Sequence, residues 1–413
     1  MHPYEIFVLI VCLTAAFSYI NHRYIKWPPT IGIMALSLCS SIVLLISAKA
    51  FPGYSSGFIS IITSINFHDL LMNGMLNFLL FAGAIHIDAG RLKQERMPVI
   101  TLSTIGILIS TFLIGSVLYY LFGLFQLDVK YIYCLLFAAL ISPTDPIAVL
   151  AILKQAGIQK SLELKIAGES LFNDGVAVVV FITILEVAQT GLDKLSVTEI
   201  ALLFMREAGG GLLYGLLLGY LGFNIIKSID KYEVEVLISI ALVMGGYLLA
   251  NMLHISGPLA MVVAGIVVGN KGRQKGISDI TLDYFNKFWE LIDEMMNAAL
   301  FLLMGFEMLV IKVNSSILVI GIISIVVILS GRWVSVLIPV KLLGRRINFE
   351  KNAVAILTWG GLRGGLSIAL ALSLPENMHR DMFVAITYIV VIFSIIVQGL
   401  SIGSLYKMLS ARK

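Results

Sequence analysis

Residues 142–146 read Ser-Pro-Thr-Asp-Pro and interrupt an apolar stretch that extends from about residue 130 to residue 153. The two prolines remove two backbone donors, and their rings clash with the preceding helical turn. Asp145 precedes the second proline, where the backbone is pushed out of the helical region. We therefore expect two half-helices, with Asp145 capping the second half and the carbonyl oxygen of Thr144 facing a polar cavity. The alternative is a simple proline kink with a capping Asp.

The composition around this motif is that of a polytopic membrane protein. Of 413 residues, 59% are hydrophobic and 13% are charged, against roughly 25% charged in a soluble domain. One soluble core cannot hide this excess of apolar residues. The net charge of +4 and the absence of a long basic run exclude a disordered chain and a nucleic-acid binder. The three cysteines match no disulfide or zinc spacing, and we expect no cofactor.

Thirteen segments are apolar enough to be transmembrane helices, which need about 20 residues each. The first is not expected to be a cleaved signal peptide, because no Lys or Arg precedes it. The sequence therefore predicts an all-α polytopic membrane protein with about 13 transmembrane helices. Their approximate limits are 3–21, 28–48, 68–88, 98–123, 130–153, 161–189, 201–227, 233–253, 256–270, 284–310, 316–340, 350–374 and 381–406.

The basic residues alternate between the connecting loops. Loops after odd-numbered spans, with the C-terminal tail, contain 20 of the 29 Lys and Arg, whereas loops after even-numbered spans contain five. The positive-inside rule places the basic loops in the cytoplasm. We therefore expect a cell-membrane protein with its N-terminus outside and its C-terminus in the cytoplasm. No loop is long enough to fold separately, so residues 1–413 are expected to form one integral membrane domain.

A second polar motif lies inside the sixth span, where residues 168–175 read Gly-Glu-Ser-Leu-Phe-Asn-Asp-Gly. Helical spacing puts Ser170 and Asp174 on one face, and Glu169 and Asn173 form a neighbouring stripe. Charged residues at this depth are costly and therefore candidates for function. Oxygen ligands of this kind suit hard cations. The alternative is a polar network that only joins helices.

A third motif lies in the twelfth span, where residues 359–365 read Trp-Gly-Gly-Leu-Arg-Gly-Gly. Four glycines make a poor helix, so we expect a second unwound segment or a very close helix crossing. Arg363 needs a carboxylate partner at this depth, and Glu169 is the first choice because it leaves Asp174 free. The alternative is a glycine packing face with a snorkelling Arg.

Two interrupted helices in corresponding positions of two halves are typical of a secondary transporter with inverted repeats. We expect spans four to six and eleven to thirteen to be these repeats, with spans five and twelve as the broken crossing helices. In the tenth span, Glu290, Asp293 and Glu294 could form a cation-attracting entrance on the cytoplasmic side or a solvated helix start. Arg332, in the eleventh span, needs a partner that the sequence does not identify.

On these residues the chain resembles the sodium/proton antiporters of the NhaP/NHE branch of the monovalent cation:proton antiporter family. The resemblance covers essentially the whole length. Its most specific part is the segment 142–146 followed by 169–174, including the adjacent Asn173 and Asp174. The Gly-Leu-Arg-Gly run at 361–364 agrees independently.

The resemblance implies a cation site inside the membrane. Asp174 would bind the cation and the proton in turn, with Ser170 and the main-chain oxygen of Thr144 as further Na⁺ ligands. Asn173 would occupy the place of a second Asp in electrogenic relatives, so electroneutral exchange is expected. Asp145 would support the crossing, with Asn173 as its hydrogen-bond partner.

The resemblance also implies which residues hold the fold together and which helices form the scaffold and the mobile core. Glu169 and Arg363 would form a structural ion pair, and the protein would be a homodimer in the lipid bilayer that transports monovalent cations and protons. The scaffold and dimerisation helices would lie at about 1–90 and 201–310, and the mobile core helices at about 98–190 and 316–406.

One position departs from the family pattern. Some members carry a Glu in a third-helix segment shaped like Phe-Glu-Ala-Gly-Leu-His-Leu-Asp, whereas residues 81–88 read Phe-Ala-Gly-Ala-Ile-His-Ile-Asp. Ala82 stands where that Glu would be, which leaves the choice between Na⁺, Li⁺ and K⁺ open.

Other functions are also compatible with buried acids. An intramembrane hydrolase could use Asp145 and Asp174 as an acid pair, or Ser170 as a nucleophile. No Gly-x-Gly-Asp, His-Glu-x-x-His or Gly-x-Ser-x-Gly motif supports an enzyme. A channel or a proton-coupled carrier of an organic solute is a third class. Turnover that saturates and flux that reverses with an imposed sodium gradient would argue against a channel. A K⁺/H⁺ antiporter of the same fold is the alternative within the family.

Overall fold

A computed structural model describes residues 3–50, 65–191, 195–229, 231–274, 279–311, 314–344, 347 and 349–411. Within these residues the secondary structure is helical, apart from one isolated β-bridge. The described part of the chain includes nine helices that are long and apolar enough to cross a membrane, and two shorter apolar helices. The all-α prediction is confirmed.

Each predicted span coincides with one helix or with consecutive helical segments, while the count of thirteen crossings stays a prediction. Helix boundaries differ from the predicted limits by a few residues. The α-helices are α1 (Pro3–Ile20), α2 (Pro29–Ala50), α4 (Phe67–Asp69), α5 (Leu76–Ile85), α6 (Ala89–Gln94), α7 (Arg96–Ser103), α8 (Ile105–Leu124), α9 (Tyr131–Ile141), α10 (Ile147–Gln155), α11 (Lys160–Thr190), α12 (Val197–Lys227), α13 (Tyr232–Met252), α14 (Gly257–Gln274), α15 (Asp279–Phe306), α16 (Ser315–Leu343), α17 (Ala353–Trp359), α18 (Gly365–Leu372), α19 (Arg380–Ile392) and α20 (Gly399–Ala411). Short π- or 3₁₀-helical segments join them at η1 (Asn21–Ile25), η2 (Leu70–Met75), η4 (Glu307–Leu309), η5 (Glu376–Met378) and η6 (Phe393–Gln398).

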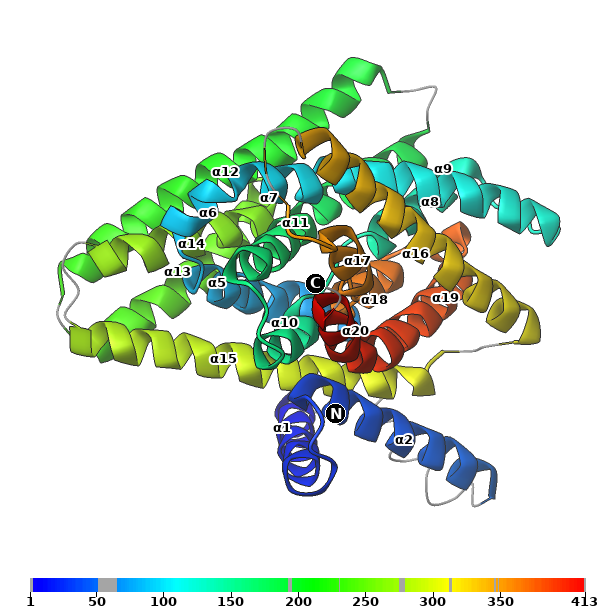
Figure 1. Cartoon of the computed structure of the whole chain (residues 1–413), viewed down its shortest axis with the longest axis horizontal. Helices are drawn as coiled ribbons and strands as arrows, with labels where there is room; N and C mark the ends of the chain where they lie inside the picture. Colours follow the sequence, from blue (N-terminus) through cyan, green and yellow to red (C-terminus); the bar gives the residue numbers. More distant parts are fainter. Residues whose placement is uncertain are drawn as a thin grey trace.

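The helices pack in two groups that are joined by α11. In the first group, α14 lies between α12 and α5, and α15 packs against α5 and α2. Glycines allow this close approach, because a Cβ at Gly215 would lie 2.6 Å from the carbonyl oxygen of Ala260, and one at Gly265 would lie 2.7 Å from that of Phe81. Figure 1 shows α15 along one side of the molecule, with α1 and α2 outside it.

The second group consists of α7, α8, α9, α16, α18 and α19, which contact one another. The long helix α11 packs against α7 and α9 of this group, and against α12 and α14 of the first group. The polar segment of α11 therefore lies where the two groups meet.

Both predicted helix interruptions are confirmed. One helix stops at Ile141 and resumes at Ile147, and the other stops at Trp359 and resumes at Gly365. The two extended segments meet in an antiparallel bridge, in which the Asp145 amide donates to the carbonyl oxygen of Leu362 at 2.8 Å. The half-helices α17 and α18 lie near the middle of the molecule in Figure 1. We call this place, where segments 142–146 and 360–364 meet, the crossing, and it brings together the ends of four half-helices.

Candidate functional site

Asp145 lies at the N-terminal ends of two half-helices. Its Oδ1 accepts a hydrogen bond of 3.0 Å from the amide of Ile147, the first residue of α10, so its carboxylate binds the N-terminal end of the second half-helix as predicted, although the N-cap position itself is Pro146. A Cβ at Gly364, directly before α18, would lie 2.6 Å from Oδ2 of Asp145. Helix N-termini carry partial positive charge, which favours a carboxylate at this point.

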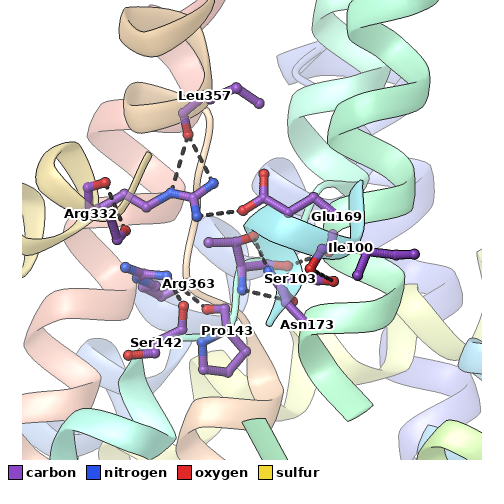
Figure 2. A network of polar contacts seen from close by, with 12 residues as sticks. Ile100, Ser103, Ser142, Pro143, Glu169, Asn173, Arg332, Leu357 and Arg363 are labelled. Carbon is purple, nitrogen blue, oxygen red and sulfur yellow. Dashed lines mark hydrogen bonds and ion pairs between the residues drawn. The ribbon is translucent and has the colours of Figure 1, made fainter. Parts of the chain in front are cut away.

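Two arginines occupy the opposite, C-terminal ends of the half-helices. Nη1 of Arg363 donates to the carbonyl oxygens of Ser142 at 2.6 Å and of Pro143 at 2.9 Å, at the end of α9. Nε and Nη2 of Arg332, from α16, donate to the carbonyl oxygen of Leu357 in α17 at 3.4 and 3.2 Å. Figure 2 shows both guanidinium groups beside these carbonyls. Positive charge is favourable there, because the last carbonyls of a helix carry partial negative charge.

Glu169 pairs with Arg332, and this differs from the expected pairing with Arg363. Nη1 of Arg332 lies 2.5 Å from Oε1 of Glu169, and the two residues are 4% and 2% exposed (Figure 2). The guanidinium of Arg363 is directed at the carbonyls that end α9 instead. The position of Arg332 inside an apolar span was the sequence signal, but it did not identify the partner.

Thr144 is held by two side chains from α11. The hydroxyl of Ser170 donates to the carbonyl oxygen of Thr144. Nδ2 of Asn173 donates to Oγ1 of Thr144 at 2.8 Å, and the amide of Thr144 donates to Oδ1 of Asn173 at 3.4 Å. The partner of Asn173 is therefore Thr144, where the expectation was Asp145. Two of the three predicted cation ligands, Ser170 and Thr144, are in direct contact.

Asp174 differs from these neighbours because its carboxylate makes no hydrogen bond or ion pair within the described residues. It is partly exposed, whereas Asn173 is buried. It lies one helical turn after Ser170 and interacts electrostatically with Asp145. The next residue, Gly175, lies against Leu259 of α14. Asp174 is thus at the boundary between the two helix groups.

Two further contacts were not predicted from the sequence. Oγ of Ser394, in η6, accepts a hydrogen bond of 2.8 Å from the amide of Arg363, and Leu362 supplies the carbonyl oxygen of the β-bridge. Ser394 lies outside the three polar motifs, and Leu362 lies inside the third motif but contributes only a main-chain oxygen. Ala82 is fully buried in α5, so no acidic side chain comes from that position.

Comparisons with known proteins agree over nearly the whole chain. The family model described as "Sodium/hydrogen exchanger, transmembrane" matches residues 10–408. The Na⁺/H⁺ antiporter NhaP of Pseudomonas aeruginosa is 46% identical over 412 residues, which cover 98% of this chain and 97% of that protein. The Na⁺/H⁺ antiporter NhaH of Halobacillus aidingensis is 33% identical, with 99% of each chain covered.

A solved structure gives the same result for the fold. The sodium proton antiporter MjNhaP1 from Methanocaldococcus jannaschii superposes with a TM-score of 0.75 at 21% identity, covering 100% of this chain and 99% of that one.

Proposed function

Because this chain belongs to the sodium/hydrogen exchanger family, we propose that it exchanges Na⁺ or Li⁺ for H⁺ across the cell membrane through one shared site at Asp174. The chain is a multi-pass membrane protein and a secondary transporter, not an enzyme. The observation that carries the proposal is that Asp174, a partly exposed residue, has no hydrogen-bond or ion-pair partner for its carboxylate among the described residues. In the crossing beside it, Glu169 pairs with Arg332, and Arg363 donates to main-chain carbonyls.

The ligands that we propose for the cation are all oxygens. The carboxylate of Asp174 would supply the charge, and the hydroxyl of Ser170 and the carbonyl of Thr144 would supply two neutral donors. These two groups already touch each other, so a bound ion would exchange one hydrogen bond for two ion–oxygen contacts. An all-oxygen set suits a hard cation such as Na⁺ or Li⁺.

The coupling follows from the cost of moving an unneutralised carboxylate through a low-dielectric barrier. Asp174 carries one negative charge, which either one Na⁺ or one H⁺ neutralises. Asn173 adds no charge and is engaged with Thr144. One-for-one, electroneutral exchange follows, because the loaded site is neutral in both directions.

The moving part that we propose is the core formed by residues of about 98–190 and 316–406, against a scaffold at about 1–90 and 201–310. The packing of the helices in two groups that meet at α11 supports this division. Alternating access would move the crossing as one body past α14 and α5, so that Asp174 faces each side in turn. The scaffold would form the homodimer, with the N-terminus outside and the C-terminus in the cytoplasm.

The test is proton flux in proteoliposomes with Na⁺, Li⁺ and K⁺ supplied separately, with and without a clamped voltage. We expect Na⁺ and Li⁺ to drive flux that does not depend on voltage. Asp174→Asn should abolish this flux without changing the elution volume of the purified protein. Glu186→Gln is the matched control, because Glu186 is an exposed acid on the same helix. Sodium-driven flux that survives in Asp174→Asn would refute the assignment, and flux with K⁺ alone would refute the choice of cation.

A further inference from the structure

Asp293 lies in the middle of α15 and not at its start. The helix runs from Asp279 to Phe306 over 28 residues, so Asp293 is near its midpoint. Its neighbours Glu290 and Glu294 are exposed, whereas Asp293 is partly buried. The structure therefore separates three acids that the sequence groups at one entrance, and only Asp293 is directed inward.

The inward face of α15 points to the crossing. Leu300 lies against Gly365, the first residue of α18, because a Cβ there would be 2.6 Å from Cδ1 of Leu300. Asn297 and Asp293 lie about one and two helical turns before Leu300 on the same face. The negative charges of Asp293 and Asp145 repel each other, and Asp145 lies beside the start of α18. Asp293 thus faces the crossing from the first helix group.

Asn297 adds a polar group with an unused acceptor. It is 3% exposed, and its Nδ2 donates to Oδ1 of Asp293 at 3.1 Å and to the carbonyl oxygen of Asp293 at 2.8 Å. Its Oδ1 is buried and has no hydrogen-bond partner among the described residues. An unsatisfied buried amide oxygen is costly, so this position indicates a group that binds at the site.

We propose that the carboxylate of Asp293 and the amide oxygen of Asn297 form a second binding site for the monovalent cation, called the station below. From this site the ion moves to Asp174. This inference rests on the proposed function. Carboxylate and amide oxygens are suitable donors for a hard cation, and water would complete its shell. With two protein oxygens the station binds weakly, so the ion can leave it. Its negative charge raises the local concentration of cations next to the transport site.

A purely structural role predicts a different result. If the Asp293–Asn297 contact only stabilised α15, its removal would lower the thermal stability and leave the apparent KM for Na⁺ unchanged. A station on the ion path instead changes the apparent KM and leaves the maximal rate nearly intact, because Asp174 still performs the exchange.

The experiment measures Na⁺-driven proton flux in proteoliposomes over a range of Na⁺ concentrations. We expect Asp293→Asn to raise the apparent KM for Na⁺ about tenfold and to keep the maximal rate within about twofold. Asp293→Glu should recover most of the loss. Glu294→Gln is the matched control, since it removes an exposed charge one residue away, and it should change neither quantity.

A wild-type KM in Asp293→Asn would overturn the inference, and so would an equal rise in Glu294→Gln, which would indicate a diffuse surface charge. If Asp293→Asn does not fold, Asn297→Ser is decisive, because it removes the amide oxygen, together with the Nδ2 donor to Asp293, but keeps the carboxylate of Asp293, and it should also raise the KM. If the unsubstituted protein exchanges normally and these variants keep its apparent KM for Na⁺, the station alone is refuted. Absence of Na⁺- or Li⁺-driven exchange in the unsubstituted protein refutes the proposed function and the station together.

Discussion

Arg332 and Glu169 form a buried ion pair whose Nη1 and Oε1 atoms lie 2.5 Å apart. The same guanidinium donates to the carbonyl oxygen of Leu357, so it connects α16, α11 and the end of α17. Neither side chain has the solvent exposure needed to hydrate its charge alone. The pair therefore fixes one half of an interrupted helix to the helix that carries Asp174.

Arg332→Gln should lower the stability of the protein by about 3–5 kcal/mol, because it removes the direct ion-pair partner of the buried Glu169. The measurement is the thermal unfolding midpoint of the purified protein in detergent, together with the yield. Arg380→Gln is the control, since Arg380 pairs with Glu376, whose side chain is 82% exposed, and such pairs contribute about 0–1 kcal/mol. Equal midpoints for the two variants would contradict a stabilising role of the buried pair.

The two helix interruptions were predictable because their causes are local. Pro143 and Pro146 cannot continue a helix, and the glycines around Arg363 weaken one. The partner of Glu169 was not predictable, since Arg332 and Arg363 both lie deep in apolar spans. The choice depends on how α16 and α17 pack, which directs Arg363 to the end of α9 and leaves Arg332 beside the acid.

The same limit applies to Asn173 and Asp293. Asn173 was expected to contact Asp145, but the Asp145 carboxylate caps α10 and lies against Gly364, so Thr144 is the partner. Asp293 was placed near an end because the predicted span began at residue 284, whereas α15 begins at Asp279. A shift of five residues, just over one helical turn, moves Asp293 to mid-helix depth.

Gly364→Ala should abolish exchange and cost about 1–3 kcal/mol of stability, because the added methyl would lie 2.6 Å from Oδ2 of Asp145. The readouts are proton flux and the unfolding midpoint. Gly245→Ala offers a clean comparison, since a Cβ at that position of α13 meets nothing within 4 Å. It should raise helix stability by up to about 1 kcal/mol and preserve flux. Active, stable Gly364→Ala protein would show that the close approach is not needed.

Ser170→Ala should weaken cation binding while proton binding at Asp174 persists. Loss of one oxygen ligand is worth about 1–2 kcal/mol, or about a five- to thirtyfold rise in the apparent KM for Na⁺. The maximal rate at saturating Na⁺ should change much less. Ser373→Ala provides the comparison, because the hydroxyl of Ser373 donates to a carbonyl at the end of the preceding helix, at Leu370, and to no other group in the described part of the chain. An unchanged KM in Ser170→Ala would remove Ser170 from the ligand set.

Lys165 is 1% exposed and joins two acids from distant parts of the chain. Its Nζ lies 2.9 Å from Oε1 of Glu350, in the connection between α16 and α17, and 3.4 Å from Oε2 of Glu95. Burial tends to raise the pKa of Glu350, but hydrogen bonds from Ser161 and Lys165 and the charge of Lys165 outweigh it. The pKa of Glu350 is therefore held below its ordinary value of 4.5.

Stability should consequently depend on pH through Glu350. A carboxyl whose pKa is lower in the folded state stabilises the protein above its unfolded pKa of 4.5, and this contribution is lost as the pH falls through the folded value. At pH 7, Glu350→Gln should have a lower unfolding midpoint than the unsubstituted protein. In strongly acidic buffer the two midpoints should approach each other. Glu376→Gln, at an exposed acid, should follow the unsubstituted protein at every pH. A constant difference between Glu350→Gln and the unsubstituted protein from pH 7 to pH 3 would mean that Glu350 acts through packing, because an ionised partner of Lys165 must lose its effect once it is protonated.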